Sequence, residues 1–345
     1  MKRKNIIIIS CAVAILLATI GFCSKQYYHY TVSNFTSLDS ESHAYHIYPN
    51  TSIDSIFTLL KTDYKIGSEL AWCIQCKYKK FTQAKPGHYH FATKISNREI
   101  IRRFQFGEQT PIRLSFTQSI RTREQLAGHL GQKLLLDSAE IKLRLDDPSY
   151  MAKFGLNPET AVCMFIPNTY EVYWTTDADK LFARMFREYN TFWNEKRIKK
   201  AQKLGLTPVE VTTIASIIAS ETNKKEEYPT IASIYINRLK KGIALQACPT
   251  VIFATGDFTL RRVLKRHLEI DSPYNTYKYA GLPPGPIRLA RPDIIDAVLN
   301  APNTNYLFMC ANPDFSGTHI FSATYAQHSA VARQYQQELN RRKIQ

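Results

Sequence analysis

The sequence contains little cysteine. Its 345 residues include seven cysteines, too few and too scattered along the chain to form a disulfide framework. Cys73 and Cys76 form a lone CxxC in "WCIQCKY", but no second pair or nearby histidine cluster completes a zinc site. We therefore expect these two side chains to share one face of an amphipathic helix. Cys163, Cys248 and Cys310 are expected to be buried small apolar residues. The sequence predicts no metal site and no cofactor.

Acidic residues are also scarce relative to basic ones. The chain has 29 Asp and Glu against 45 Lys and Arg, a formal net charge of +16. Such an excess suggests nucleic acid as a partner, but the N-terminus points elsewhere, and we predict no nucleic-acid binding. The charge fits an anionic environment such as a membrane surface, and a merely solvated basic surface explains it equally well.

Charge is absent from a stretch near the N-terminus. The basic segment "MKRKN" precedes "IIIISCAVAILLATIGFC", and the 18 residues from Ile6 to Cys23 are at the short end of what crosses a bilayer. The cations before the span predict a cytoplasmic N-terminus and an extracytoplasmic remainder. We interpret residues 1–5 as a cytoplasmic tail and 6–23 as a single-pass anchor in the cytoplasmic membrane. A cleaved signal peptide is the alternative, but the apolar run is long for one and no cleavage-site pattern follows. Lipid modification of Cys23 is another, although a bulky Phe22 precedes it.

The length suggests two domains, and the chain lacks internal repeats and low-complexity segments. Residues 24–43 are polar and tyrosine-rich, which predicts a linker. Strand and helix patterns over 44–108 predict a small α+β unit with no obvious catalytic cluster. Residues 109–345 are expected to form a larger α+β domain. Within it, the amphipathic stretch "DADKLFARMFREYNTFWNEKRIKKAQKLG" has the acidic start, basic end and final glycine (Gly205) typical of a helix.

The stretch "IASIIASETN" places a carboxylate at the end of an apolar stripe. Its helix begins with "TPVE", in which Thr207 is the predicted N-cap, Pro208 the first helical residue and Glu210 the capping-box partner. Ile214, Ile217 and Ile218 then lead to Glu221 on the same face. Apolar surroundings and the negative helix C-terminus both raise a carboxyl pKa, and a protonated carboxyl suits a general acid. Alternatively, Glu221 pairs with a cation such as Arg238 or simply reaches solvent.

The segments that follow supply candidate binding residues. "EEYPTIASIYINRLKKG" predicts a second helix packing on the first, with Glu221 at the crook of the hairpin. Polar and aromatic groups in the later loops resemble what a glycan cleft needs, although well-packed turns have the same composition. A lone histidine such as His319, in "GTHIFS", is more often a satisfied core residue than a catalyst. The candidate substrate-binding residues are Asn237, Arg238, Gln246, Thr250, Tyr274, Asn275, Thr276, Tyr277 and His319.

Taken in order, "SIIASETN", "EEYPTIASIYINRL", "LQACPTV", "SPYNTYKYAGLPPGPI" and "GTHIFS" resemble the endolytic murein transglycosylase family, also called YceG-like. The resemblance also covers "FIPNTYE" and the N-terminal anchor, and it implies that residues 44–108 form a LysM-like subdomain. It implies that Glu221 is the catalytic glutamate. The family cleaves the β-1,4 bond between N-acetylmuramic acid and N-acetylglucosamine within peptidoglycan strands and leaves 1,6-anhydro ends. Because the sugar's own 6-hydroxyl attacks, one carboxyl group suffices where hydrolysis usually needs two. Peptidoglycan strands are then the substrate, and peptidoglycan synthases are possible partners.

Two positions depart from the family pattern. Cys248 and Asn168 stand where the family usually has Asp, so any carboxylate role there is absent or relocated. A hydrolytic muramidase is the nearest rival enzyme, and its products would be heavier by one water. A non-catalytic cell-wall-binding or scaffold protein is the rival from another class.

Overall fold

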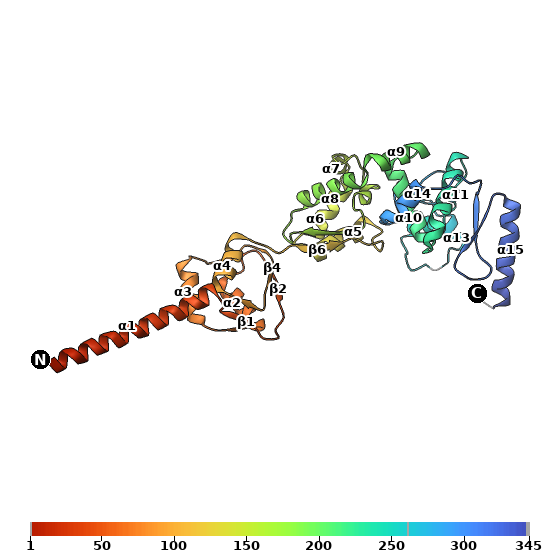
Figure 1. The fold of residues 1–345 in the computed structure, drawn as a ribbon. Coiled ribbons are helices and arrows are strands. Elements are labelled where there is room, and N and C mark those ends of the chain that lie inside the picture. The colour runs from red at the N-terminus through yellow and green to blue at the C-terminus, as the bar shows by residue number, and fades with distance from the viewer. Residues whose placement is uncertain (1, 261, 343–345) are drawn as a thin grey trace. The chain divides into compact units, whose positions relative to one another are not determined.

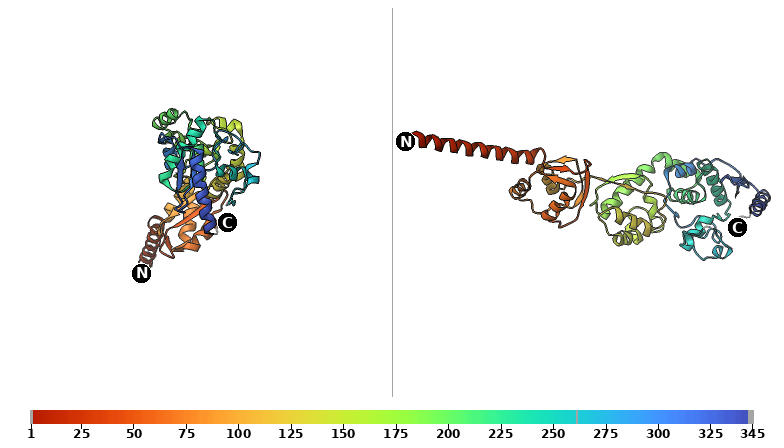
Figure 2. Two further views of the ribbon diagram at one scale, coloured as in Figure 1. Left: turned by 90° about the vertical axis from the view of Figure 1, so that its right-hand side faces the viewer. Right: turned by 90° about the horizontal axis from the view of Figure 1, so that it is seen from below.

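The computed structural model describes residues 2–260 and 262–342 as a mixed α+β protein (Figure 1). The chain divides into two compact units, which we describe separately. Unit 1 consists of residues 1–113 and 171–176, and unit 2 of residues 114–170 and 177–345. Figure 2 shows the same elements from two further sides.

Unit 1 begins with one long helix. Helix α1 (Lys2–Thr31) contains a segment apolar enough to cross a membrane, with a hydropathy of 2.8, and none of that segment is buried. This helix is compatible with a single-pass anchor. Residues 24–43, expected to be a linker, carry regular structure instead: α1 continues to Thr31, and β1 (Phe35–Ser37) is the middle strand of a sheet. This segment has no periodic pattern of apolar residues because only a few of its side chains, such as His29 and Phe35, are buried.

The rest of unit 1 alternates strands and helices. Its elements are β2 (His43–Ile47), α2 (Ile53–Asp63), β3 (Tyr64–Ile66), α3 (Glu69–Tyr78), β4 (Gly87–Phe91), β5 (Lys94–Ile95) and α4 (Asn97–Phe106). Strands β3, β1 and β5 form one sheet in that order, and β2 pairs antiparallel with β4. An aromatic core that includes Phe35, Trp72, Tyr89 and Phe104 lies between them. The expected helices are present, and α4 ends at Gly107, whose φ of 72° is the left-handed conformation of a helix cap.

The first half of unit 2 is mainly helical. Its elements are α5 (Arg123–Lys133), α6 (Ser138–Asp146), α7 (Pro148–Ala152), the 3₁₀ helix η1 (Ala161–Met164), α8 (Ala178–Phe192) and α9 (Glu195–Leu204). Strands β6 (Ile112–Ser115) and β7 (Thr169–Val172) pair where the chain passes between units. The amphipathic stretch before Gly205 forms two helices rather than one. It breaks at Trp193 because Asn194 caps α9, accepting a hydrogen bond from the backbone N–H of Arg197 at 3.1 Å.

The second half of unit 2 carries the remaining sequence motifs. Its elements are α10 (Pro208–Glu221), the 3₁₀ helix η2 (Lys225–Glu227), α11 (Tyr228–Lys240), α12 (Cys248–Thr255), α13 (Lys265–Leu268), α14 (Pro292–Leu299), the antiparallel strands β8 (Phe308–Ala311) and β9 (His319–Ser322), and α15 (Tyr325–Arg341). Helix α10 packs against α11, α12 and α14. Its predicted capping box between Thr207 and Glu210 is confirmed.

Two of the cysteine predictions for this region were wrong. Cys163 is buried, but Cys248 is exposed and Cys310 is half-buried. Cys248 is the first residue of α12 and its side chain faces a loop hydroxyl rather than the apolar core, as described below.

Candidate active site

Glu221 is the last residue of α10, directly after a fully buried segment. Every residue from Val211 to Ala219 is buried, whereas Ser220 and Glu221 are half-buried. The Glu221 carboxyl therefore lies where the apolar core gives way to solvent. Tyr235, on α11, is itself buried and donates a hydrogen bond from Oη to Glu221 Oε1 at 3.0 Å. The expected hairpin places the acid at its crook, with α11 supplying the first polar partner.

The surroundings of Glu221 keep it protonated up to neutral pH. Burial raises the pKa of Glu221 from its ordinary value of 4.5 to about 7. The hydrogen bond from Tyr235 and the nearby charge of His319 oppose this rise, because both stabilise the carboxylate. A carboxyl group with a pKa near 7 can donate a proton and take one back at the same pH, as acid–base catalysis requires.

A second carboxylate, Glu227, connects the end of α10 to β9. It is 7% exposed, and its Oε1 accepts a hydrogen bond from the backbone N–H of His319 at 2.5 Å. Its Oε2 accepts hydrogen bonds from His319 Nδ1 at 3.0 Å and from the Thr222 hydroxyl at 3.1 Å. Thr222 is the C-cap of α10, adjacent to Glu221. Glu227 thus fixes both the helix end and the histidine beside the candidate acid.

Arg288, in the segment after the proline-rich turn, forms hydrogen bonds that fix the C-terminal turn of α10. Its Nη1 donates to the Ala219 carbonyl at 3.1 Å, and its Nε donates to the Gln118 carbonyl at 2.8 Å. In the same segment, the backbone N–H of Ile287 donates to Ser216 Oγ at 3.0 Å. A cation at a helix C-terminus is stabilising. The "GPIR" part of the proline-rich loop therefore anchors the turn that carries Glu221.

Cys248 and Tyr277 form a second polar group near Glu221. Cys248 Sγ lies 3.1 Å from Tyr277 Oη. Burial raises the pKa of Tyr277, and the hydrogen bond with Cys248 and the charge of Glu221 raise it further. Burial also raises the pKa of the Cys248 thiol, and the Glu221 charge adds to that rise. The charge of Glu221 thus raises the pKa of both side chains.

Three of the predicted binding residues connect segments of the fold. Asn237 Nδ2 donates to the carbonyls of Thr304 (2.8 Å) and Tyr306 (3.0 Å). The Arg238 guanidinium is buried and donates to four oxygen atoms: the backbone carbonyls of Leu307, Ala244 and Leu245, and Oε1 of Gln246. Arg238 therefore does not pair with Glu221, contrary to the alternative considered from the sequence.

Three further predicted residues are buried, one in α12 and two in the loop after α13. Thr250, Asn275 and Thr276 are at most 1% exposed. Thr250 Oγ1 and Thr276 Oγ1 lie 2.8 Å apart, and Asn275 Nδ2 donates to the carbonyls of Leu268 and Ile270. Side chains so enclosed have no surface to offer a glycan, so their part is to shape the loop that presents Tyr277.

Tyr274 lies in a different part of the loop. Its ring packs on Phe253 at a centroid distance of 4.6 Å and lines a pocket of about 340 Å³ with Arg121 and Phe258. Neither Glu221 nor His319 lines that pocket. Of the predicted residues, His319 carries a charge that lowers the pKa of Glu221, and Tyr277 has a pKa that the Glu221 charge raises.

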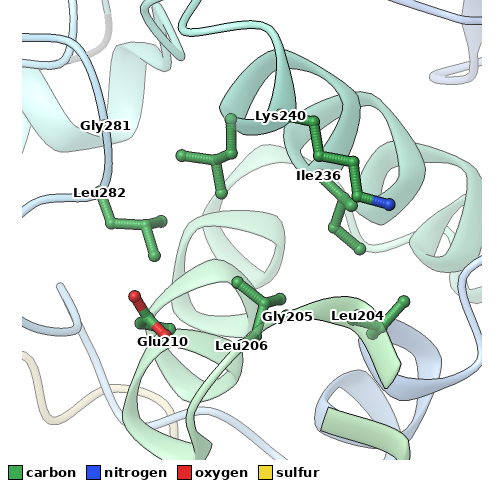
Figure 3. A pocket seen from close by; sticks show the side chains of 9 residues that line it. Leu204, Gly205, Leu206, Glu210, Ile236, Lys240, Gly281 and Leu282 are labelled. Carbon is green, nitrogen blue, oxygen red and sulfur yellow. The ribbon is translucent and has the colours of Figure 1, made fainter. Parts of the chain in front are cut away.

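A separate pocket lies at the other end of the helical hairpin. It has a volume of about 370 Å³ and lies between the start of α10, at Glu210, and the end of α11, at Leu239 and Lys240 (Figure 3). Its lining is mostly apolar, and Glu210 there is occupied by the capping box. It contains none of the groups described around Glu221.

Sequence reasoning missed three residues of this site. The sequence pattern places Tyr235 on the packing face of the second helix and gives Glu227 no role. Arg288 follows the proline-rich turn and carried no pattern of its own. Each acts through a partner distant in the sequence, so no local signal identified it. Within residues 2–260 and 262–342, no group of three or more His, Cys, Asp or Glu side chains is arranged to hold a metal ion.

Comparisons with known proteins agree with this architecture. A model of the YceG-like family matches residues 45–334. An endolytic murein transglycosylase of Bacillus subtilis is 28% identical over 301 residues, which cover 83% of this chain and 82% of that protein. The enzyme of the same name from Streptococcus pneumoniae is 25% identical and covers 83% of this chain and 57% of its own length. A crystal structure of a yceG-like protein from Listeria monocytogenes superposes with a TM-score of 0.57 at 28% identity, covering 84% of this chain and 99% of that one.

The fold, the protonated glutamate at a helix end and these relatives define an enzyme of the lytic transglycosylase class. The chain belongs to the YceG-like family, since the family match covers most of its length.

Proposed function

We propose that this protein is a membrane-anchored endolytic murein transglycosylase. It cleaves the β-1,4 bond between N-acetylmuramic acid and N-acetylglucosamine within peptidoglycan strands and leaves 1,6-anhydro ends. The observation that carries the proposal is Glu221, which has a pKa of about 7 at the solvent edge of an apolar helix. Glu221 protonates the glycosidic oxygen as the bond breaks, then removes the proton from the sugar's 6-hydroxyl as that oxygen closes the anhydro ring.

The environment of the second carboxylate favours this reaction over hydrolysis. Hydrolytic glycosidases usually use a second carboxylate to attack the sugar or activate water. Glu227 is buried, and both its oxygens accept hydrogen bonds from Thr222 or His319. A carboxylate so occupied is a poor base for an incoming water. The intramolecular hydroxyl needs only Glu221.

Contacts to the glycan come from the accessible part of the site. Tyr277 is half-buried, with its hydroxyl beside Cys248, and His319 is half-buried opposite Glu227. We propose that these two side chains flank the bound sugar. The two helices α2 and α3, which lie in the sequence between the paired strands β2 and β4 with the short strand β3 between them, support a LysM-like role for unit 1, in which it holds the glycan strand.

Helix α1 anchors the enzyme in the cytoplasmic membrane, with the N-terminus inside and both units outside. The support is the unburied apolar segment of α1 and the cations that precede it. Outside the membrane, peptidoglycan synthases are possible partners in wall assembly.

Mass spectrometry of digested polymeric peptidoglycan tests the proposed reaction. We expect products with 1,6-anhydro ends from the purified protein and none from Glu221→Gln. Products heavier by one water would identify a muramidase. Tight glycan binding without cleavage would favour the scaffold alternative.

A further inference from the structure

The membrane-proximal end of unit 1 has an unusual exposed surface on α3. Leu70, Ile74 and Tyr78 are 53%, 42% and 76% exposed, and their spacing of four residues places them on one helix face. Phe106, at the end of α4, is 65% exposed. Scattered exposed apolar residues need no explanation, but a stripe of three on one helix does.

Exposed cations follow the C-terminal end of this stripe and continue on α4. The exposed basic residues of α3, α4 and the turn after α3 are Lys77, Lys79, Lys80, Arg98 and Arg102. Lys79, Arg98 and Arg102 line a pocket of about 330 Å³ together with Tyr30 of α1 and Phe106. Of the acidic residues nearby, Glu69 pairs with Lys61 and Glu108 with Arg102. Glu99 of α4 and Asp54 of α2, whose charge acts on Cys76, are the others. An apolar stripe flanked by cations is typical of a helix that lies on a lipid surface.

The rest of unit 1 packs against the C-terminal end of α1. His29, in the last turn of α1, is buried, and a Cβ added at Gly67 would lie 2.6 Å from its Cε1 atom. Asn34 follows α1, and its Nδ2 donates to the Ser68 carbonyl at 3.0 Å while its Oδ1 accepts from the Ser68 N–H at 2.7 Å. Ser68 is the N-cap of α3. The start of α3 is therefore fixed to the point where α1 ends.

Because α1 is one continuous helix, its length gives the distance between the apolar run and this surface. Tyr30 is seven positions after Cys23, the last residue of the apolar run, so at 1.5 Å per residue the pocket begins about 10 Å beyond the span. The polar layer of each leaflet is roughly 5–8 Å thick. Figure 1 shows α3 at the end of unit 1 from which the apolar part of α1 extends, with β2 and β4 at the opposite end. The pocket therefore begins just outside the polar layer, from where the long side chains of Lys79, Arg98 and Arg102 can reach back to it, and α3 lies at the end of unit 1 that faces the span.

We propose that α3, the turn after it and the start of α4 form a membrane-binding surface that takes anionic phospholipid headgroups. Leu70, Ile74 and Tyr78 enter the outer part of the leaflet, and Lys79, Arg98 and Arg102 bind the lipid phosphates. Unit 1 is then held against the membrane rather than on a free tether. This inference rests on the proposed membrane anchor, and not on the proposed reaction.

Fluorescence quenching in proteoliposomes tests the surface in the full chain. Cys73 lies on α3 and is exposed, whereas Cys76 and Cys163 are buried. With the other accessible cysteines replaced by serine, an environment-sensitive dye is attached to Cys73, to Cys11 in the span, or to a cysteine replacing Ala44 on β2. Vesicles contain phosphatidylcholine alone or with phosphatidylglycerol, and quenchers are placed on lipid headgroups or deep in the acyl chains.

We expect the Cys73 dye to be quenched by headgroup quenchers and the Cys11 dye by deep ones, with little quenching at position 44. Quenching at Cys73 should increase with phosphatidylglycerol and fall at high salt. If the Cys11 dye is quenched but the Cys73 dye is not, the proposal of a membrane-binding surface is wrong, while the proposed membrane anchor is retained. If the Cys11 dye is also unquenched, the anchor fails and the surface fails with it. Activity on peptidoglycan is measured separately and bears on neither result.

Charge reversal tests the role of the cations. Lys79→Glu with Arg98→Glu should abolish the effect of phosphatidylglycerol on the Cys73 dye. The matched control is Lys196→Glu with Lys203→Glu, two exposed lysines of α9 in unit 2, which should retain the effect. Because all four side chains are exposed, the thermal unfolding midpoints should stay near that of the parent chain. Equal quenching with and without phosphatidylglycerol in the parent would overturn the selection for anionic lipid.

Discussion

The Glu227 carboxylate binds His319 at two atoms, accepting from the backbone N–H at 2.5 Å and from ring Nδ1 at 3.0 Å. Because a carboxylate only accepts hydrogen bonds, Nδ1 must carry the proton. This leaves Nε2 as the ring atom that faces away from Glu227, while the charge of the ring acts on Glu221. Glu227 thus sets the orientation of a histidine whose protonation affects the candidate acid.

Glu227→Gln should lower turnover with little change in glycan binding. The amide places an NH₂ group opposite donors that now bind a carboxylate oxygen, so His319 must change its proton position or move. We expect kcat to fall about tenfold to a hundredfold, as for a small misplacement of a catalytic group, while KM stays close to that of the parent enzyme. The measurement is the initial rate of anhydro-end formation over a range of peptidoglycan concentrations.

Glu226→Gln is the matched control, because Glu226 is the adjacent residue and is exposed. Its kinetics should equal those of the parent. A folded Glu227→Gln variant with unchanged kcat would show that the contact with His319 has no part in turnover.

Local signals explain which parts of the site could be read from the sequence. The capping box at Thr207 and the apolar stripe that ends at Glu221 lie within one helix, so periodicity and propensity predict both. The bond between Glu227 and His319 joins residues 92 positions apart, and only the tertiary fold brings them together. Similarly, composition marked Thr250 as a binding residue, but it cannot reveal that its hydroxyl is used inside the loop.

Tyr235→Phe should shift the pH profile of the reaction toward higher pH. The Tyr235 hydroxyl stabilises the Glu221 carboxylate and so lowers its pKa. Without this hydrogen bond the pKa of Glu221 rises above about 7, and the protonated form persists to higher pH. The alkaline limb of kcat/KM should therefore move upward, which initial rates between pH 5 and 9 would reveal. Tyr228→Phe, on the same helix, should leave the limb in place; an unshifted or lowered limb in Tyr235→Phe would contradict this assignment.

Ionisation of Glu221 should lower the free energy of unfolding at alkaline pH. Its pKa rises from 4.5 to about 7 on folding, so the folded state binds the proton more tightly than the unfolded state. The contribution to stability is complete below pH 4.5 and is lost as the pH rises through 7, a change of about 3 kcal/mol at most. Glu221→Gln cannot ionise and should escape this loss.

Urea unfolding at acidic and alkaline pH measures the difference. Parent and Glu221→Gln should have similar unfolding free energies near pH 4.5, and the variant should be the more stable near pH 8. Glu210→Gln is an unsuitable control because it disturbs the capping box, so Glu226→Gln serves again. A variant that is no more stable than the parent at pH 8 would mean that Glu221 is solvated in the folded state.

Alkylation of Cys248 should block the enzyme. Cys248 is exposed as a residue, but its Sγ atom is partly enclosed, 3.1 Å from the Tyr277 hydroxyl and within the effect of the Glu221 charge. A bulky adduct there would occupy the space that the sugar needs. Since burial and Glu221 raise the thiol pKa, the reaction with N-ethylmaleimide should be slow at neutral pH and faster as the pH rises. The reaction is monitored by measuring the residual activity and the mass of the adduct. Cys248→Ala should resist inactivation, whereas Cys73→Ala, which removes another exposed thiol, should remain sensitive. If a chain fully alkylated at Cys248 still cleaves peptidoglycan at the parent rate, the glycan passes Glu221 on the side away from α12.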